Sequence, residues 1–292
     1  MINLIGFPGL GIEFNVNRVA FTIFGKDIFW YALIILTGFI VGVAFVLWDA
    51  KKKNISSDTI FDIAFWGLLS AIIGARIYYV IFDPSSINGN ILNIFKLWEG
   101  GLAIYGGLIG AVIAAFIYCK SKKLPILQIF DLCSPGLFIG QIIGRWGNFV
   151  NAEVYGKATT LPWGMTINGE GPVHPLFLYE SLWNLLGLIV LLLFRKHKKT
   201  DGQIFFFYCL WYASGRLLLE GMRQSQFILY IIPNILGISQ LVAFCVIIIS
   251  AISLIILQKK SKNSSMRNSL HAKISLLIMQ LWKKPTMFLS KQ

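Results

Sequence analysis

The chain has 292 residues, of which 56% are hydrophobic and only 13% are charged. Water-soluble domains carry about 25% charged residues, so this composition excludes an ordinary soluble protein. The apolar residues come in runs of roughly 20, enough to cross the hydrocarbon core of a membrane as helices that satisfy their own backbone hydrogen bonds. We therefore expect an all-α, polytopic integral membrane protein. The net charge of +13 does not indicate a nucleic-acid-binding protein, because the basic residues gather in the loops between these runs.

Seven apolar segments are predicted to span the membrane. The third follows a glycine pair at 100–101, and the fourth and fifth begin at Pro125 and Pro175, which suit the first turn of a helix. The seven predicted spans cover residues 28–48, 60–82, 101–119, 124–145, 175–194, 203–219 and 235–257. The first run is too long for the core of a cleavable signal peptide, so we expect it to remain as a span.

The distribution of lysine and arginine predicts the orientation of the chain. Most basic residues fall in 49–59, 120–123, 195–202 and the tail after 258, which share one side of the membrane in this topology. Such loops stay in the cytoplasm, so the N-terminus is expected outside and the C-terminus inside. Residues 1–257 would form the membrane domain. Residues 258–292 would form a basic cytoplasmic tail, either disordered or folded as an amphipathic helix on the membrane surface.

Small residues on two spans predict how the helices pack. Glycines recur every four residues on the third and fourth spans, a spacing that lets helices approach closely. These glycines are Gly106, Gly110, Gly136, Gly140 and Gly144. We expect the third and fourth spans to be neighbours, which would bring Tyr105 close to Arg145.

Cysteine, histidine and acidic residues show no spacing typical of a metal site or a disulfide framework. The four cysteines are expected to be small buried apolar residues. They are Cys119, Cys133, Cys209 and Cys245. We therefore expect no metal ion and no diffusible cofactor.

Polar residues within the spans gather at one depth in this topology, the outer half of the membrane. They are Tyr31, Arg76, Tyr105, Arg145, His174, Glu180, Tyr212, Arg216 and Glu220. A charged side chain inside a span costs at least about 2.5–3.5 kcal/mol, so these residues are expected to face a shared cavity. Arg216 and Glu220 alternatively neutralise each other as an i, i+4 pair. Asp62 and Asp131 fall at the inner ends and are expected to cap or pair structurally.

The most polar stretch follows the fourth span. Arg145 is succeeded by Asn148, Asn151 and Glu153 in what we interpret as a glycine-rich turn. Guanidinium groups match phosphate in a bidentate way, and amides bond hydroxyl groups. The anion found at that depth is a phospholipid headgroup. The sequence therefore predicts a phosphate site for an anionic phospholipid of the outer leaflet.

At this point the chain resembles a known family. The segment Gly144–Gly156 is similar to the signature of the prolipoprotein diacylglyceryl transferases. Further matches are Trp30-Tyr31, the run Gly100–Gly110, His174-Pro175, Leu178-Tyr179-Glu180, Tyr212, Gly215-Arg216, Glu220 and Arg223. They cover roughly residues 27–225 in the order and spacing of the family.

The resemblance implies an enzyme of the bacterial cytoplasmic (inner) membrane with seven spans and an active site facing the outer leaflet. Its members transfer the diacylglyceryl group of phosphatidylglycerol to the thiol of the lipobox cysteine in a prolipoprotein signal peptide, the first step of lipoprotein maturation. Glycerol phosphate leaves. The implied partners are phosphatidylglycerol, prolipoproteins and membrane lipids.

Residue roles follow from the resemblance and the topology together. Arg145 and Arg216 would be the catalytic phosphate-contacting arginines, and Tyr105 occupies the third catalytic position. The expected substrate-binding residues are Tyr31, Arg76, Arg145, Asn148, Glu153, Gly156, His174, Tyr212 and Glu220. Many members carry histidine where this chain has Tyr105, and tyrosine, with a pKa near 10, is a poor base at neutral pH. Arginines would lower the pKa of the incoming thiol, and His174 would either act in catalysis or cap the fifth span.

A transporter or flippase for an anionic lipid or solute is the alternative function. It would also place arginines in the membrane. Such proteins show charges at the midplane, broken helices or repeated halves. Here the charges crowd the outer half and no internal repeat is found, which favours the transferase.

Overall fold

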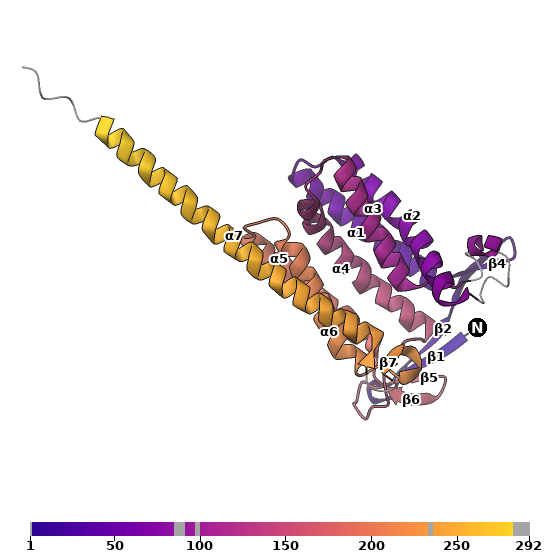
Figure 1. The fold of residues 1–292 in the computed structure, drawn as a ribbon. Coiled ribbons are helices and arrows are strands. Elements are labelled where there is room, and N and C mark those ends of the chain that lie inside the picture. Colours follow the sequence, from indigo (N-terminus) through magenta and orange to yellow (C-terminus); the bar gives the residue numbers. More distant parts are fainter. Residues whose placement is uncertain (1, 85–90, 97–99, 233–235, 283–292) are drawn as a thin grey trace, which may run out of the picture.

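The computed structural model describes residues 2–84, 91–96, 100–232 and 236–282 (Figure 1). Within these residues the chain forms seven α-helices. They are α1 (Trp30–Lys52), α2 (Ser57–Phe82), α3 (Ile104–Ser121), α4 (Ile126–Asn151), α5 (Leu176–Phe194), α6 (Gln203–Glu220) and α7 (Ile238–Trp282). Short 3-10 helices are η1 (Pro8–Leu10), η3 (Ile91–Phe95), η5 (Arg195–His197) and η6 (Ser225–Phe227). All seven predicted spans fall on these α-helices.

In the described part of the chain, six helices are long and apolar enough to cross a membrane. They are α1, α2, α3, α4, α5 extended to His197, and the first part of α7 up to Asn263. Helix α6 forms where the sixth span was predicted, but it contains Gln203, Arg216 and Glu220 and is not among these six helices. The finding is therefore a multi-pass membrane protein with six candidate spans.

The helices pack in antiparallel pairs through glycine. Gly136 of α4 lies against Gly42 of α1, where an added Cβ would come within 2.8 Å of the Gly42 carbonyl oxygen. Gly106 of α3 lies against α2, where a Cβ would come within 2.2 Å of the Gly74 carbonyl oxygen. The expectation that α3 and α4 meet along their glycines was therefore wrong. Each series does serve close packing, but against α2 and α1, because those helices offer glycines in antiparallel register.

Strands at one end of the bundle correct the expectation of an all-α chain. A four-stranded antiparallel sheet has the order β2-β1-β5-β6. Its strands are β1 (Ile2–Phe7), β2 (Ile12–Asn17), β5 (Met165–Ile167) and β6 (Glu170–Val173). Two hairpins pair β3 (Val19–Ile23) with β4 (Lys26–Phe29) and β7 (Tyr230–Ile232) with β8 (Leu236–Gly237).

The sheet is held to the helices by an apolar core. Ile5, Phe7 and Met165 are buried together with Phe177 of α5, and Phe149 of α4 packs against them. We call this end of the bundle, where Figure 1 shows β1, β2, β5 and β6, the sheet end. Because the helices alternate in direction, α4 and α6 end there and α1, α3 and α5 begin there. Chain segments far apart in sequence are thereby brought together.

The opposite end of the bundle confirms the structural roles predicted for two aspartates. Asp131 accepts hydrogen bonds from the backbone N–H groups of Gly202 and Phe205, both at 2.8 Å, and so caps α6. It also pairs with Lys198 at 2.8 Å, which raises the pKa of that ammonium although burial opposes it. Asp62 accepts a hydrogen bond of 2.7 Å from Tyr118.

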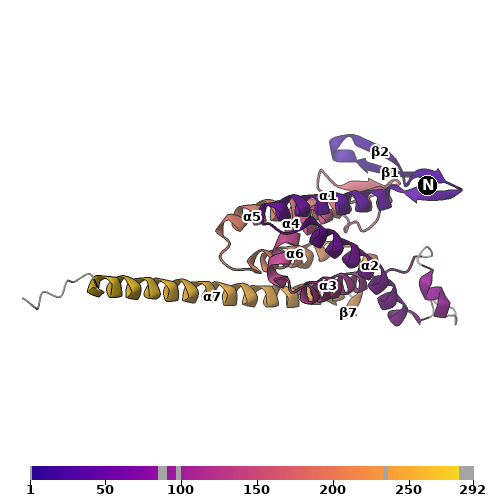
Figure 2. The same cartoon turned by 90° about the horizontal axis from the view of Figure 1, so that it is seen from above.

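Helix α7 does not stop at residue 257. It runs for 45 residues and continues well past the other helices (Figures 1 and 2). The tail was expected to be disordered or to form a separate helix. Instead its described part, through Trp282, extends the seventh span without interruption. Residues 283–292 lie outside the described residues.

The four cysteines are all free. Cys119 is buried, and Cys133 and Cys209 are partly buried, as expected for small apolar residues. Cys245 differs, because it lies exposed on α7.

Candidate active site

Three arginines and two glutamates from α4, α5 and α6 meet at the sheet end. Glu180 on α5 pairs with Arg145 of α4 at 2.5 Å and with Arg216 of α6 at 3.5 Å. Arg223, just after α6, lies 3.1 Å from the same carboxylate. One buried carboxylate thus joins three guanidinium groups.

A second carboxylate completes this group. Glu220 lies 2.9 Å from Arg216 and 3.3 Å from Arg223. It also accepts a hydrogen bond of 2.6 Å from the hydroxyl of Ser239, at the start of α7. We call Arg145, Arg216, Arg223, Glu180 and Glu220 the arginine cluster.

Burial and charge in the arginine cluster favour an anionic ligand. The side chains of Glu180 and Glu220 are 6% and 1% exposed, whereas those of Arg145 and Arg216 are 20% and 17% exposed. The cluster therefore buries its negative charges and leaves parts of its arginines accessible. Three cations against two anions leave one net positive charge, which a phosphate group would neutralise.

Glu180 was expected to face the shared cavity but was given no role in binding or catalysis, and Arg223 was noted only among the matched motifs. Arg223 follows α6 in a loop, yet its side chain is only 9% exposed. Burial, followed by the neighbouring Arg216, lowers the pKa of its guanidinium from the ordinary value. Glu180 and Arg223 both belong to the motifs that match the family, and this match was the evidence in the sequence that could have identified them as site residues.

The predicted turn after Arg145 is the last part of α4. The helix continues to Asn151 and ends at Ala152 in a left-handed conformation, with φ of 52°. This reversal lets the Asn148 amide donate to the Glu153 carboxylate at 3.1 Å, while the Glu153 N–H donates to the Asn148 carbonyl. Asn148 and Glu153 therefore stabilise one another one helical turn beyond Arg145.

Tyr31, at the start of α1, lies beside the same part of α4. An added Cβ on Gly147 would come within 2.8 Å of the Tyr31 ring, so only glycine permits this contact. The Tyr31 hydroxyl is within electrostatic range of Glu153 and Arg145. The structure thus brings together Tyr31, Arg145 and Glu153 as the sequence predicted.

Gly156 contributes through its backbone. It forms a β-bridge with Arg223, and its N–H donates to the His174 carbonyl at 2.9 Å. A Cβ at this position would lie 2.6 Å from the Cβ of His174 and 3.0 Å from the Met222 carbonyl oxygen. Gly156 therefore holds the segment that carries Arg223 against the segment before α5.

Tyr105 and Tyr212 lie near Arg216. Both are within electrostatic range of its guanidinium. Tyr212 is on the same face of α6 one turn away, and Tyr105 enters from α3 with its ring 6.4 Å from that of Tyr78. Tyr105 thus lies in the neighbourhood of Arg216, although α3 and α4 do not pack along their glycines.

Arg76 was predicted to bind the substrate, but it does not join the arginine cluster. Its guanidinium donates to the backbone carbonyls of Ile94, Asn93, Gly100 and Gly101, at 3.0, 2.7, 2.8 and 3.3 Å. The side chain is therefore committed to the connection between α2 and α3. Its intramembrane position was predicted correctly, but backbone carbonyls take the place of the expected phosphate.

His174 does not cap α5, whose first turn lacks a side-chain cap. Its ring Nδ1 lies 3.3 Å from the Tyr179 hydroxyl, which accepts a hydrogen bond from Trp163. Its backbone pairs with Gly156 and Lys157. His174 thus supports the loop beside the arginine cluster.

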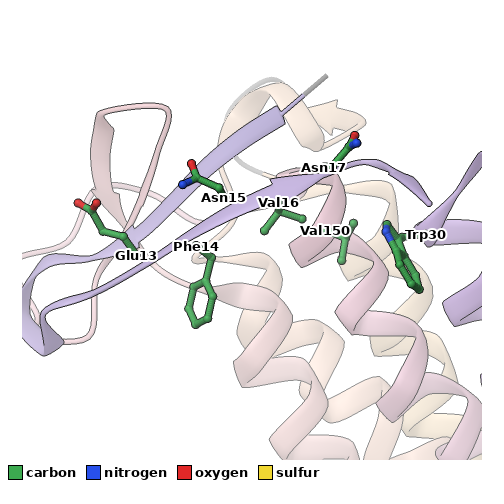
Figure 3. A pocket seen from close by; sticks show the side chains of 7 residues that line it. All are labelled: Glu13, Phe14, Asn15, Val16, Asn17, Trp30 and Val150. Carbon is green, nitrogen blue, oxygen red and sulfur yellow. The ribbon is translucent and has the colours of Figure 1, made fainter. Parts of the chain in front are cut away.

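A hollow on the sheet side adjoins this region (Figure 3). It is lined by Glu13, Phe14, Asn15, Val16, Asn17, Trp30 and Val150. None of these residues is in the predicted set, although Trp30 precedes Tyr31 and Val150 lies on the last turn of α4. With one carboxylate and no cation, the hollow does not fit an anion, so the arginine cluster is the better candidate. Among the described residues, no group of His, Cys, Asp and Glu suited to a metal ion is found.

Comparisons with known proteins show the family of this chain. The family model for prolipoprotein diacylglyceryl transferase matches residues 18–256. A phosphatidylglycerol–prolipoprotein diacylglyceryl transferase of Finegoldia magna is 45% identical over 254 residues, covering 87% of this chain and 99% of the relative. Proteins of the same name from Clostridioides difficile and Enterococcus faecalis are 43% and 40% identical, covering 85% and 87% of this chain and 98% and 95% of theirs. The chain belongs to the prolipoprotein diacylglyceryl transferase family.

Proposed function

We propose that this protein transfers the diacylglyceryl group of phosphatidylglycerol to the lipobox cysteine of prolipoproteins and releases glycerol phosphate. The names of its relatives state both substrates. The observation that carries the proposal is the meeting of Arg145, Arg216 and Arg223 on the Glu180 carboxylate, which presents a net cationic group to one phosphate.

The reaction is a substitution at carbon. The cysteine thiolate attacks the diacylglyceryl carbon that is bonded to the phosphate ester oxygen. A C–S bond forms, the C–O bond breaks, and its electron pair leaves on glycerol phosphate. Negative charge therefore grows on the phosphate oxygens, and preorganised cations at that point stabilise the transition state.

Arg145 and Arg216 take this role in the proposal. Each keeps a contact to a buried carboxylate and is still partly exposed, so it is held in place before the lipid binds. Glu180 and Glu220 orient the guanidinium groups rather than act as bases. The same cations lower the pKa of an approaching thiol, whose ordinary value is near 8.5, and so favour the thiolate. Tyr105 orients the thiol or a phosphate oxygen.

We place the arginine cluster on the outer side of the bacterial cytoplasmic membrane. The basic residues of 49–59, 120–123 and 195–202 gather at the opposite end of the bundle, which supports a cytoplasmic location for that end. Helix α6 would be the sixth of seven spans, shielded from lipid by its neighbours α5 and α7. The N-terminus then lies outside and the C-terminus inside.

The test measures release of glycerol phosphate from phosphatidylglycerol by the purified protein in detergent. A lipobox peptide is supplied as acceptor, and a peptide with serine in place of its cysteine is the control. Release that depends on the thiol, together with a peptide heavier by one diacylglyceryl group, supports the transferase. Movement of phosphatidylglycerol between the leaflets of vesicles that contain the protein, without release of glycerol phosphate, would support a transporter and contradict the proposal.

A further inference from the structure

Two polar side chains face each other deeper in the bundle than the arginine cluster. The side-chain amide Nε2 of Gln141, on α4, donates to the hydroxyl of Tyr208, on α6, at 2.7 Å. The Tyr208 ring lies parallel to that of Tyr212, with centroids 6.2 Å apart and an angle of 13°. These contacts join α4 and α6 on the faces that also carry Arg145 and Arg216.

Helix geometry gives the depth of this pair. Gln141 precedes Arg145 by four residues, which is about 6 Å along the helix at 1.5 Å per residue. Tyr212 and Tyr208 precede Arg216 by one and two such steps. The polar groups therefore form a line that descends from the arginine cluster toward the middle of the membrane.

The hydrogen bonding of the Gln141–Tyr208 pair is incomplete. The buried Oε1 of Gln141 has no partner among the described residues. The Tyr208 hydroxyl accepts a hydrogen bond from the Gln141 amide. The hydroxyl hydrogen of Tyr208 and the second amide hydrogen of Gln141 therefore remain available as donors. A half-turn of the amide exchanges the roles, so that Oε1 accepts from the Tyr208 hydroxyl and the amide N–H groups become the free donors. In either arrangement the pair offers a donor, in surroundings where an unmet polar group is costly.

A phosphatidyl lipid carries acceptors at this depth. Its acyl ester carbonyls lie on the hydrocarbon side of the phosphate, a few bonds away, and they accept hydrogen bonds without donating any. If the phosphate occupies the arginine cluster, an ester carbonyl falls about one helical turn deeper than Arg145, at the level of Gln141. The apolar chains would continue toward the hydrocarbon core.

We propose that Gln141 and Tyr208 form a subsite that binds an acyl ester carbonyl of the diacylglyceryl group. The inference rests on the proposed function and specifies which part of the lipid the site recognises. Holding the phosphate and the ester at once fixes the carbon between them, which is the carbon attacked by the thiolate. The subsite therefore orients the reacting carbon and selects lipids with ester-linked chains.

The test compares two lipids that differ only at this acceptor. One is phosphatidylglycerol with two ester-linked chains, and the other is its analogue with two ether-linked alkyl chains of equal length, which has no carbonyl oxygen. For the wild-type protein we expect kcat/KM to be about fivefold lower with the ether lipid, the effect of one lost hydrogen bond. Gln141→Leu should lower kcat/KM for the ester lipid to the value for the ether lipid, so that the ratio of the two kcat/KM values approaches one. Tyr208→Phe should reduce the ratio in the same direction.

Ser214→Ala is the matched control. Its hydroxyl also lies on α6, but it donates to the Leu210 carbonyl of its own helix at 2.7 Å, so this variant should keep the wild-type ratio. Equal rates for both lipids in the wild-type protein, or a wild-type ratio in Gln141→Leu, would overturn the subsite. Should Gln141→Leu fail to fold, an unchanged ratio in Tyr208→Phe would overturn it equally. Absence of transfer from the ester lipid in the wild-type protein would overturn the proposed function, and the subsite with it.

Discussion

Arg145 of α4 and Arg216 of α6 bind the same carboxylate, that of Glu180, at 2.5 and 3.5 Å. Glu180 is almost fully buried and holds both guanidinium groups. Arg216 has a second contact, to Glu220 at 2.9 Å, and both arginine side chains remain partly exposed. Two arginines from distant parts of the chain are thereby set within reach of one phosphate. This arrangement decides which substitutions should damage transfer and which should not.

Replacement of Arg145 or Arg216 by lysine should lower kcat/KM for lipid transfer by about tenfold or more. Lysine keeps the charge, but a single ammonium does not contact two phosphate oxygens as a guanidinium does. Transfer from phosphatidylglycerol to a lipobox peptide measures the effect. Arg195→Lys is the matched control, because Arg195 pairs with the buried Asp49 at the opposite end of the bundle. Near-normal transfer by Arg145→Lys would remove bidentate phosphate binding from the mechanism.

Glu180→Gln should destabilise the protein and impair transfer. The substitution keeps the shape of the side chain but leaves three arginines around a single remaining carboxylate, Glu220. Loss of one partner from a buried ion pair costs about 3–5 kcal/mol, so the thermal unfolding midpoint in detergent should fall. Glu170→Gln, on the exposed part of β6, should leave that midpoint unchanged. A wild-type midpoint for Glu180→Gln would mean that the arginines do not depend on this carboxylate.

Tyr105→Phe should reduce transfer by less than about tenfold, the effect of one hydrogen bond. The ring would keep its place beside Tyr78, and only the hydroxyl in the neighbourhood of Arg216 would be lost. The dependence of kcat/KM on pH should stay unchanged, because the arginines rather than Tyr105 favour the thiolate. Complete loss of transfer, or a shifted pH profile, would instead assign a proton-transfer role to the hydroxyl.

Arg76→Ala should affect stability more than lipid binding. The variant loses hydrogen bonds from a charged group to the carbonyls of Asn93, Ile94 and Gly100, each worth about 1.5–3 kcal/mol. We expect a lower unfolding midpoint and faster protease cleavage between α2 and α3, with little change in the KM for phosphatidylglycerol. A large rise in KM at an unchanged midpoint would restore Arg76 to the lipid site.

Much of this organisation could be predicted from the sequence. Apolar runs of membrane length determine helices, and all seven predicted spans lie on helices of the structure. Asp131 could be assigned a structural role, because a carboxylate at an inner helix end has few other uses. Arg145, Asn148 and Glu153 could be recognised as a candidate site, because so many polar groups beside a span require a ligand or a partner.

Tertiary structure alone decided which polar groups face one another. Glycine spacing identifies a helix face that can pack closely, but it does not determine which helix packs there. In the structure α4 packs against α1 and α3 against α2, because those pairs bring their glycines together in antiparallel register. An intramembrane arginine needs an acceptor, yet backbone carbonyls serve Arg76 as well as a phosphate would. Likewise, Arg223 looks like an ordinary loop cation in the sequence, but in the structure its side chain lies against Glu180. Charge and hydropathy are properties of single residues, whereas an ion pair depends on the distance between two, and that distance is set by the packing of the whole bundle.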